Sequence, residues 1–371
     1  MRLADQNIEY TFETVPGLGR YIPSAPGTTP HTINDLGQIA ASTGGRGLFH
    51  GTVFGAETPV FPGYNFSALS GINNLGQLVG AVWEPGPQQG VLATGGHLEV
   101  FSYPDSFATY AHDINDSGLI VGHYSDDQQV IHGFVGTPDH LCSVNVPGAS
   151  STRAEAINNW GHIAGWYSDT SGQQHGFLSV RGHYVTVDVP EMRETAVTGI
   201  NDWGQLVGSY LDNENHRHGF VLTGKHFQTI DLPDAISTSV SDVNNLGQIV
   251  GISSYRADVP FVGNVQQERG WIGSPEFIHD EECGDTAFLR HGLNLTRSPE
   301  EEDALSFFRS MADADWNLDL PEDLCNWAEA KCGRSPALTH HHDNHDAGAF
   351  WHRDWAHPSE QGHADWKYAD L

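Results

Sequence analysis

Apolar and polar residues alternate in short runs along residues 1–267, and Gly, Pro, Asn and Asp separate the runs. Alternation with a period of two, as from Val185 to Val189, is typical of a strand with one buried face, whereas an amphipathic helix repeats every 3.6 residues. Proline ends several of these runs, and it cannot donate a hydrogen bond to a neighbouring strand. This part of the chain is therefore predicted to be all-β.

One segment recurs here at a nearly constant interval. It has the form Ile/Val-Asn-(Asp/Asn)-x-Gly, and successive copies are separated by 39, 42, 43, 43 and 43 residues. A proline 11 residues before the Asn of most copies, and the triplet His-Gly-Phe at residues 132–134, 175–177 and 218–220, recur in phase. The Asn residues of the six copies are Asn34, Asn73, Asn115, Asn158, Asn201 and Asn244. Six copies at this period indicate a repeat architecture.

Each unit is predicted to hold four short strands. They are a His-Gly-Phe strand, an alternating strand that stops at proline, a strand ending in Gly-Ile-Asn, and a strand of the Gln-Leu-Val-Gly type. The Asn-(Asp/Asn)-x-Gly segment between the last two suits a tight hairpin, because Asn and Gly tolerate a positive φ. Four strands in about 43 residues is the size of a propeller blade.

The two ends of the repeat region complement each other. Pro260 to Gly263 is predicted as the His-Gly-Phe-type strand of a sixth unit with nothing after it, and Ile8 to Pro16 as an alternating strand with nothing before it. Joining them completes a blade and leaves no exposed sheet edge. We therefore predict a closed six-bladed β-propeller, rather than a linear solenoid that would need capping repeats.

The repeat resembles the HAF repeat, a family described as probable extracellular repeats of bacterial proteins. The resemblance rests on the His-Gly-Phe and Asn-x-x-Gly elements, is best from His175 to Tyr210, and covers about residues 8–264. It implies a propeller-like architecture and a secreted setting, and it implies no reaction.

A second domain, predicted at residues 268–371, has a different composition. Two short helices are expected to begin near Ser298 and Pro321, where Pro and acidic residues occupy a first helical turn. The last 34 residues hold seven of the 22 histidines, interleaved with Asp and Trp. We predict a small α-helical, His-rich extension after the propeller at residues 1–267.

Charge and the lengths of the apolar runs exclude two classes of partner. The chain carries 47 acidic and 17 basic residues, a formal net charge of −30. Phosphate binding needs clustered Lys and Arg, so nucleic acid is not an expected partner. No apolar run is long enough for a transmembrane helix, so membrane insertion is not expected.

The compartment stays open. Met1 to Asn7 carries no apolar core typical of a signal peptide. The chain as it stands is expected in the cytoplasm; if a leader has been removed, it is secreted, as the family resemblance suggests.

Imidazoles and carboxylates clustered in the last residues indicate a metal site, because both are ligands of divalent transition metals. The expected ligands are His340, His342, His345, Asp346, His352 and His357. Their spacing matches no established helical metal motif, so a flexible acidic tail with unselective metal affinity is the alternative.

Histidines that recur from unit to unit are expected to do a structural job, a hydrogen bond between neighbouring strands. They are His50, His132, His175 and His218. The recurring Asp126, Asp169 and Asp212 lack the D-x-D-x-D-G pattern of a calcium loop and are interpreted as turns.

Residues that break the repeat are the better candidates for a unique site. They are His112, Arg153, Glu155, Glu191, Arg193, Glu194 and the loop 212–218. Solvated loops are the plainer interpretation of the same residues.

Two functions remain open. The first is a recognition or scaffold module that binds a protein, glycan or small molecule at the channel mouth. The second is an enzyme, metal-dependent or not, whose site at one mouth of the channel is completed by the His/Asp/Trp-rich extension.

Overall fold

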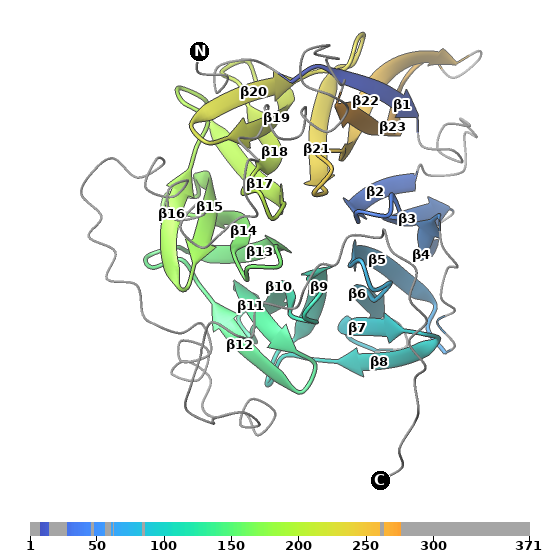
Figure 1. Cartoon of the computed structure of the whole chain (residues 1–371). Coiled ribbons are helices and arrows are strands. Elements are labelled where there is room, and N and C mark those ends of the chain that lie inside the picture. Colours follow the sequence, from blue (N-terminus) through green and yellow to red (C-terminus); the bar gives the residue numbers. More distant parts are fainter. Residues whose placement is uncertain are drawn as a thin grey trace, which may run out of the picture. The chain divides into compact units, whose positions relative to one another are not determined.

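The computed structural model describes residues 8–14, 28–45, 48–55, 61, 63–83, 86–259 and 263–275 of the 371-residue chain. Every regular element in these ranges is a β-strand, and the strands form six separate antiparallel sheets. Figure 1 shows these sheets as blades around a central channel, each with one strand innermost. The innermost strands contact one another in a closed circle. The predicted six-bladed β-propeller is confirmed.

We number the blades in the chain order of their innermost strands. Blade 1 holds β2 (Thr28–Ile33), β3 (Ile39–Gly45) and β4 (Leu48–Phe54). Blade 2 holds β5 (Phe66–Ile72), β6 (Leu78–Trp83), β7 (Gln89–Thr94) and β8 (His97–Phe101). Blade 3 holds β9 (Ala108–Ile114), β10 (Ile120–Ser125), β11 (Ile131–Thr137) and β12 (His140–Val144). Blade 4 holds β13 (Ser151–Ile157), β14 (Ile163–Ser168), β15 (Gln174–Val180) and β16 (His183–Val187). Blade 5 holds β17 (Glu194–Ile200), β18 (Leu206–Leu211), β19 (Arg217–Thr223) and β20 (His226–Ile230). Residues 56–60, where a fourth strand of blade 1 would fall, lie outside the described ranges.

Blade 6 joins the two ends of the repeat region, as predicted. Its strands, from the channel outward, are β21 (Ser237–Val243), β22 (Ile249–Val259), β23 (Gly263–Pro275) and β1 (Tyr10–Thr14). β1 pairs with the last five residues of β23, so a strand from the start of the chain is the outer edge of the blade. A blade that takes strands from both ends of the repeat region holds the ring closed.

The predicted first strand of this blade was wrong. Pro260 to Gly263 does not occupy the His-Gly-Phe position; instead Gly270 and Trp271 lie opposite Ile252 and Gly251, in the register of the Gly-Phe pairs of other blades. The hairpin between β22 and β23 is longer than elsewhere, and the indole of Trp271, 2% exposed, fills the space that a phenylalanine fills in blades 3 to 5. Sequence comparison missed this strand because its motif reads Arg-Gly-Trp.

β23 runs to Pro275, past residue 267, which the sequence predicted as the last residue of the propeller. Residues 276–371, which include the predicted helices, lie outside the described residues. The helical, His-rich extension therefore stays a prediction.

Every innermost strand carries a β-bulge at the same place. The pairing register shifts by one residue three positions before the repeat Asn, and the extra residues are His31, Ser70, His112, Glu155, Thr198 and Ser241. A bulge turns its side chain away from the regular pleat and is frequent beside binding sites. The fold thus presents one re-aimed side chain on the innermost strand of each blade.

The Asn-x-x-Gly hairpins follow these strands. The Gly adopts a positive φ in all six copies, +73° at Gly37 and +82° at Gly118 among them, as predicted. The Asn does not; its side-chain Oδ1 instead accepts two backbone N–H groups of the hairpin, such as those of Trp203 and Gln205 on Asn201. Glycine is needed here for its backbone, and asparagine for its amide. Within the described part of the chain no helix could cross a membrane.

Candidate functional site: the axial channel

Two rings of side-chain hydrogen bonds surround one mouth of the channel. In the outer ring, the repeat Asn of each blade donates from Nδ2 to the backbone carbonyl of the repeat Asn in the next blade. The six N···O distances lie between 3.0 and 3.2 Å, and the last bond, from Asn244 to Asn34, closes the circle. All six Asn residues are buried. This ring ties the blades to one another by a polar seam.

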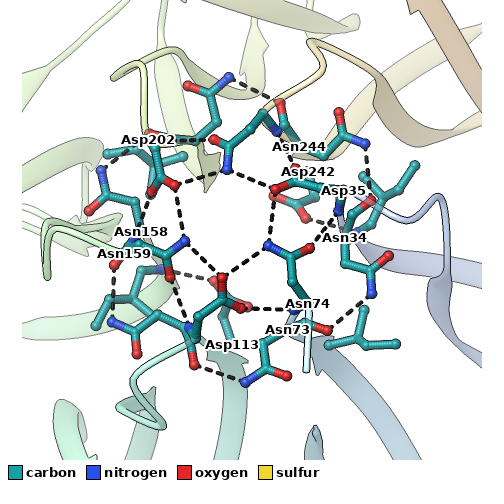
Figure 2. A pocket seen from close by; sticks show the side chains of 18 of the residues that line it. Asn34, Asp35, Asn73, Asn74, Asp113, Asn158, Asn159, Asp202, Asp242 and Asn244 are labelled. Carbon is teal, nitrogen blue, oxygen red and sulfur yellow. Dashed lines mark hydrogen bonds between the residues drawn. The ribbon is translucent and has the colours of Figure 1, made fainter. Parts of the chain in front are cut away.

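The residue after each repeat Asn forms the second ring, and around it Asp and Asn alternate strictly. The order is Asp35, Asn74, Asp116, Asn159, Asp202 and Asn245. Each Asn donates its two Nδ2 hydrogens to the Oδ2 atoms of the two flanking Asp residues, over 2.9 to 3.1 Å. Figure 2 shows these atoms as a closed circuit around an open centre. We call this circuit the Asp/Asn ring.

The Asp/Asn ring satisfies its carboxylates with amide donors only. Each Asp also accepts a backbone N–H on Oδ1, as Asp202 does from Asn159 over 2.8 Å. Burial raises the pKa of Asp202, against the lowering effect of its hydrogen bonds from Asn159 and Asn245 and with a smaller contribution from the charge of Asp35. The ring is therefore a stable set of acceptors that carries up to three negative charges.

Two further acids lie on innermost strands, three positions before a residue of the Asp/Asn ring. Asp113 in blade 3 and Asp242 in blade 6 line the same pocket as the ring. Asp113 accepts the backbone N–H groups of Ile114 and Ile157, and Asp242 accepts that of Ile33. Burial raises the pKa of Asp113 to about 7. Burial, and then the charge of Asp113, raise the pKa of Asp242 well above its ordinary value.

Apolar side chains crown the same mouth. The x position of the Asn-(Asp/Asn)-x-Gly hairpin holds Leu36, Leu75, Trp160, Trp203 and Leu246, and only blade 3 has a small polar residue, Ser117. The leucines are 69%, 71% and 43% exposed. The two indoles are half-buried, and each donates its N–H to a backbone carbonyl of the next hairpin. We call these five side chains the crown.

The structure brings together three of the residues singled out because they break the repeat. His112 and Glu155 are bulge residues of neighbouring blades, with His112 Nδ1 3.2 Å from Glu155 Oε2. His112 Nε2 lies 2.7 Å from Nδ1 of His123 on β10, and Arg153 Nη2 lies 3.1 Å from His123 Nε2. Trp166 Nε1 donates to Glu155 Oε1 over 2.9 Å. The repeat alone did not indicate His123 or Trp166, because both are second-strand residues next to a repeated Gly.

One arrangement of protons satisfies this network. Arg153 only donates, so it donates to His123 Nε2. His123 then donates from Nδ1 to His112 Nε2, and His112 donates from Nδ1 to the Glu155 carboxylate. The chain of hydrogen bonds runs in one direction, from a cation to an anion, through two neutral imidazoles. Such a network positions its members but leaves its histidines without a free nitrogen for a reaction.

The electrostatics agree with neutral imidazoles. Burial, and then the charges of His112 and Arg153, lower the pKa of His123 to about 2. Burial, followed by Arg153 and His31, holds the pKa of His112 well below its usual range. Burial lowers the pKa of His31 to about 4.

These lowered histidine pKa values predict that the fold loses stability at acid pH. Because the folded pKa of His123 is depressed, its contribution to stability is complete above about pH 6.5 and is lost as the pH falls through the range 6.5 to about 2. We expect His123→Asn to flatten the fall in unfolding free energy between pH 6.5 and 4 by up to about 1.4 kcal/mol per pH unit, measured by urea unfolding. The same substitution at the exposed His97 should leave the slope unchanged, and an unchanged slope for His123→Asn would contradict the neutral network.

The recurring histidines hold strands together, as predicted. His175 Nδ1 lies 2.8 Å from Asp188 Oδ2, and His218 bonds Asp231 and Asp212 over 2.9 and 3.3 Å. His132 makes equivalent contacts, and each of the three rings stacks on a second-strand tyrosine. The side chain of His50 lies outside the described part. Asp126, Asp169 and Asp212 each accept two backbone N–H groups of their own turn, which confirms their interpretation as turns.

The other candidates do not join the channel site. Arg193 donates to Asn215, and Glu191 accepts from Asn213 through its backbone carbonyl, in exposed loops. Glu194 is the first residue of β17. The predicted metal ligands His340, His342, His345, Asp346, His352 and His357 lie outside the described residues. Among residues 8–275 that the structure describes, no group of three or more His, Cys, Asp or Glu is placed to hold a metal ion.

No family model and no curated protein matches the chain. Similar solved structures include a lectin from Aleuria aurantia in complex with a fucosyl-N-acetylglucosamine, at 12% identity and a TM-score of 0.41 over 67% of this chain and 96% of the lectin. AofleA from Arthrobotrys oligospora has 14% identity and a TM-score of 0.43 over 72% and 89% of the two chains. YCF48 bound to a D1 peptide has 8% identity and a TM-score of 0.33 over 80% and 98%. At these values the site has to be interpreted from its own residues, and the resemblance to the HAF repeat stays a prediction.

Proposed function

We propose that the chain is a recognition module and that a protein partner docks on the axial face formed by the crown and the mouth of the channel. The exposed leucines of the crown carry this proposal. Leu246, Leu36 and Leu75 follow one another on blades 6, 1 and 2, and two of them are about 70% exposed. Adjacent large apolar side chains kept in water beside a pocket mark an interaction surface.

A protein fits this surface better than a glycan. The three Asn residues of the Asp/Asn ring spend both Nδ2 hydrogens inside the ring, so the floor offers acceptors and almost no donors to sugar hydroxyls. Three of the five crown residues are aliphatic, and apolar side chains of a protein bury such groups well. A glycan is the competing ligand in the test below.

The test removes the crown without disturbing the hairpins. Blade 3 carries Ser at the crown position, so Leu36→Ser, Leu75→Ser and Leu246→Ser together copy a residue that this hairpin already accepts. We expect peptides selected from a random displayed library on the unsubstituted protein to bind the triple variant at least about tenfold more weakly. Phe107→Ser with Met192→Ser, at exposed positions outside the crown, is the matched control and should bind normally.

Two results would overturn the proposal. One is a library that yields no peptide whose affinity depends on the crown. The other is a glycan, identified on a panel of oligosaccharides, whose binding the triple variant loses. Far-UV circular dichroism and the urea midpoint of each variant show that a loss of binding is not a loss of fold.

The alternative of an enzyme depends on the His/Asp/Trp-rich segment at residues 339–366, which lies outside the described residues. No observation in the described channel favours it, since the His112–Glu155 network is internally paired.

A further inference from the structure

The alternation of Asp and Asn gives the mouth of the channel a threefold pattern of charge. The six corner atoms of the ring, three Asp Oδ2 and three Asn Nδ2, are joined by edges of 2.9 to 3.1 Å. A regular hexagon has its centre as far from each corner as the corners are from one another. A flat, regular hexagon with these edges would have its centre about 3.0 Å from its three carboxylate oxygens and from its three amide nitrogens alike. Figure 2 shows the ring around an open centre.

We propose that this ring recognises a primary ammonium group, the side chain of a lysine on the docking partner, placed on the channel axis. The proposal rests on the proposed function, and it names the group that the axial face selects. A primary ammonium has three N–H donors related by threefold symmetry, and one donor points at each of Asp35, Asp116 and Asp202. The distance of about 3.0 Å lies within the range of N–H···O hydrogen bonds.

The charge of the pocket favours a cation of this size. Its lining includes the three ring acids Asp35, Asp116 and Asp202 and no Lys or Arg. The deeper Asp113 and Asp242, whose pKa values are raised by burial, add less negative charge at neutral pH. A narrow channel lined by one sign of charge concentrates ions of the other sign. Each ring Oδ2 already accepts two amide hydrogens. The ammonium adds one charge-assisted hydrogen bond to each of the three, while the amide hydrogen bonds stay in place.

A second observation points to a polar occupant below the ring. Thr32 is 7% exposed, and its hydroxyl has no hydrogen-bond partner. Thr32 pairs with Ala40 in the register at which Asp113 pairs with Val121 and Asp242 with Val250, so its side chain belongs to the same layer of the channel. Gly71 and Gly199 add no side chain to this layer and let the next strand approach closely, because a Cβ at either would lie 2.8 Å from the Cα of Asp113 or Asp242. Buried polar groups without a partner normally face a water or a ligand.

The crown supplies the remaining selectivity. The ring is too narrow for an alkyl chain, so the ammonium enters from outside and its methylene stem stays among the crown leucines. A lysine stem is apolar up to its charged end. An arginine is less suitable, because its planar guanidinium presents a fork that matches one carboxylate side by side rather than three around an axis.

The first experiment uses the unsubstituted protein and small probes at constant ionic strength. n-Butylammonium and n-butyltrimethylammonium carry the same charge and stem, but only the first has N–H donors. We expect n-butylammonium to bind at least about tenfold more tightly than its trimethyl analogue and than K⁺, measured by calorimetry or ligand-observed NMR. Equal binding of the two organic cations, equal binding of K⁺, or no binding would each overturn the proposal.

A second experiment separates this proposal from the proposed function. Peptides that depend on the crown are compared with versions in which lysine is replaced by arginine, Nε-acetyllysine or norleucine. We expect each replacement to weaken binding at least about tenfold. Peptides that need the crown but tolerate all three replacements would refute the ammonium site and leave the recognition function standing. Asp116→Asn should abolish the preference for lysine, with Asp139→Asn, an exposed turn residue, as its control.

Discussion

Replacing Asn201 by Ala is expected to lower the free energy of unfolding by about 3 to 5 kcal/mol. Its side chain, in a residue that is 3% exposed, donates to Asn244 O over 3.1 Å and to Gln205 Oε1 over 2.7 Å, and it accepts the backbone N–H groups of Trp203 and Gln205. Alanine leaves these four partners without the side chain, and several of them are buried. Unmet buried polar groups cost about 1 to 3 kcal/mol each, so the loss is larger than that of one ordinary hydrogen bond.

Urea unfolding at pH 7 measures this effect, and two further variants test its cause. Asn201→Asp keeps the shape but turns an oxygen toward the carbonyl of Asn244, so it should destabilise the fold at least as much as Asn201→Ala. Asn213→Ala, at an exposed loop residue, should stay within about 0.5 kcal/mol of the unsubstituted protein. A loss below about 1 kcal/mol for both substitutions of Asn201 would mean that the ring of repeat Asn residues does not hold the blades together.

The second large effect is expected for Gly165→Ala, because of space rather than hydrogen bonding. A Cβ at Gly165 would lie 2.0 Å from the backbone oxygen of Arg153 and 2.9 Å from the ring of Phe177. Gly165 pairs with Ala154, directly before the bulge of β13, so the strands would have to separate there. Overpacking of a side chain costs about 1 to 3 kcal/mol, and a backbone clash of this size should exceed that range.

Two other glycines separate the causes. Gly118→Ala tests the positive φ alone, since nothing lies within 4 Å of its Cβ, and it should cost about 1 kcal/mol. Gly86→Ala has open space and an ordinary φ, so it should be nearly neutral. If Gly165→Ala destabilises the protein no more than Gly118→Ala, in the same urea series, the tight approach of β13 and β14 is not a constraint on folding. In a folded Gly165→Ala protein Arg153 should also be displaced. Because Arg153 contacts His123, the fall in unfolding free energy between pH 6.5 and 4 should then change as well.

Much of the site could have been predicted from the repeat. The residues after the repeat Asn alternate between Asp and Asn in all six copies, and the residues after those are nearly all large and apolar. Both patterns become meaningful once the copies form a ring, because an alternating pattern closes on itself only when the number of blades is even. The order of the copies along the chain therefore contained the ring, whereas its geometry depended on closure.

The His112–His123–Arg153–Glu155 network shows the opposite case. His112, Arg153 and Glu155 were recognisable because they break the repeat, but nothing in their spacing of 41 to 43 residues joins them to His123. They meet because β-bulges on neighbouring blades turn His112 and Glu155 toward one another. The local sequence pattern does not indicate which residues of neighbouring blades face one another.

By itself, the sequence of this protein determined the strands of a blade, the number of blades and the closure of the ring. It could do so because the period near 43 residues, the strand alternation and the hairpin glycines are local features that recur in each copy. It misplaced one strand, Pro260 to Gly263, where Arg and Trp replaced His and Phe while the space to be filled stayed the same. Only the tertiary structure decided that the carboxamides and carboxylates of six residues would meet in one ring. It also decided that the crown leucines would stay exposed and that Thr32 would be buried without a hydrogen-bond partner. Those positions are set by the packing of blade against blade, which brings residues about 40 positions apart within 3 Å of each other.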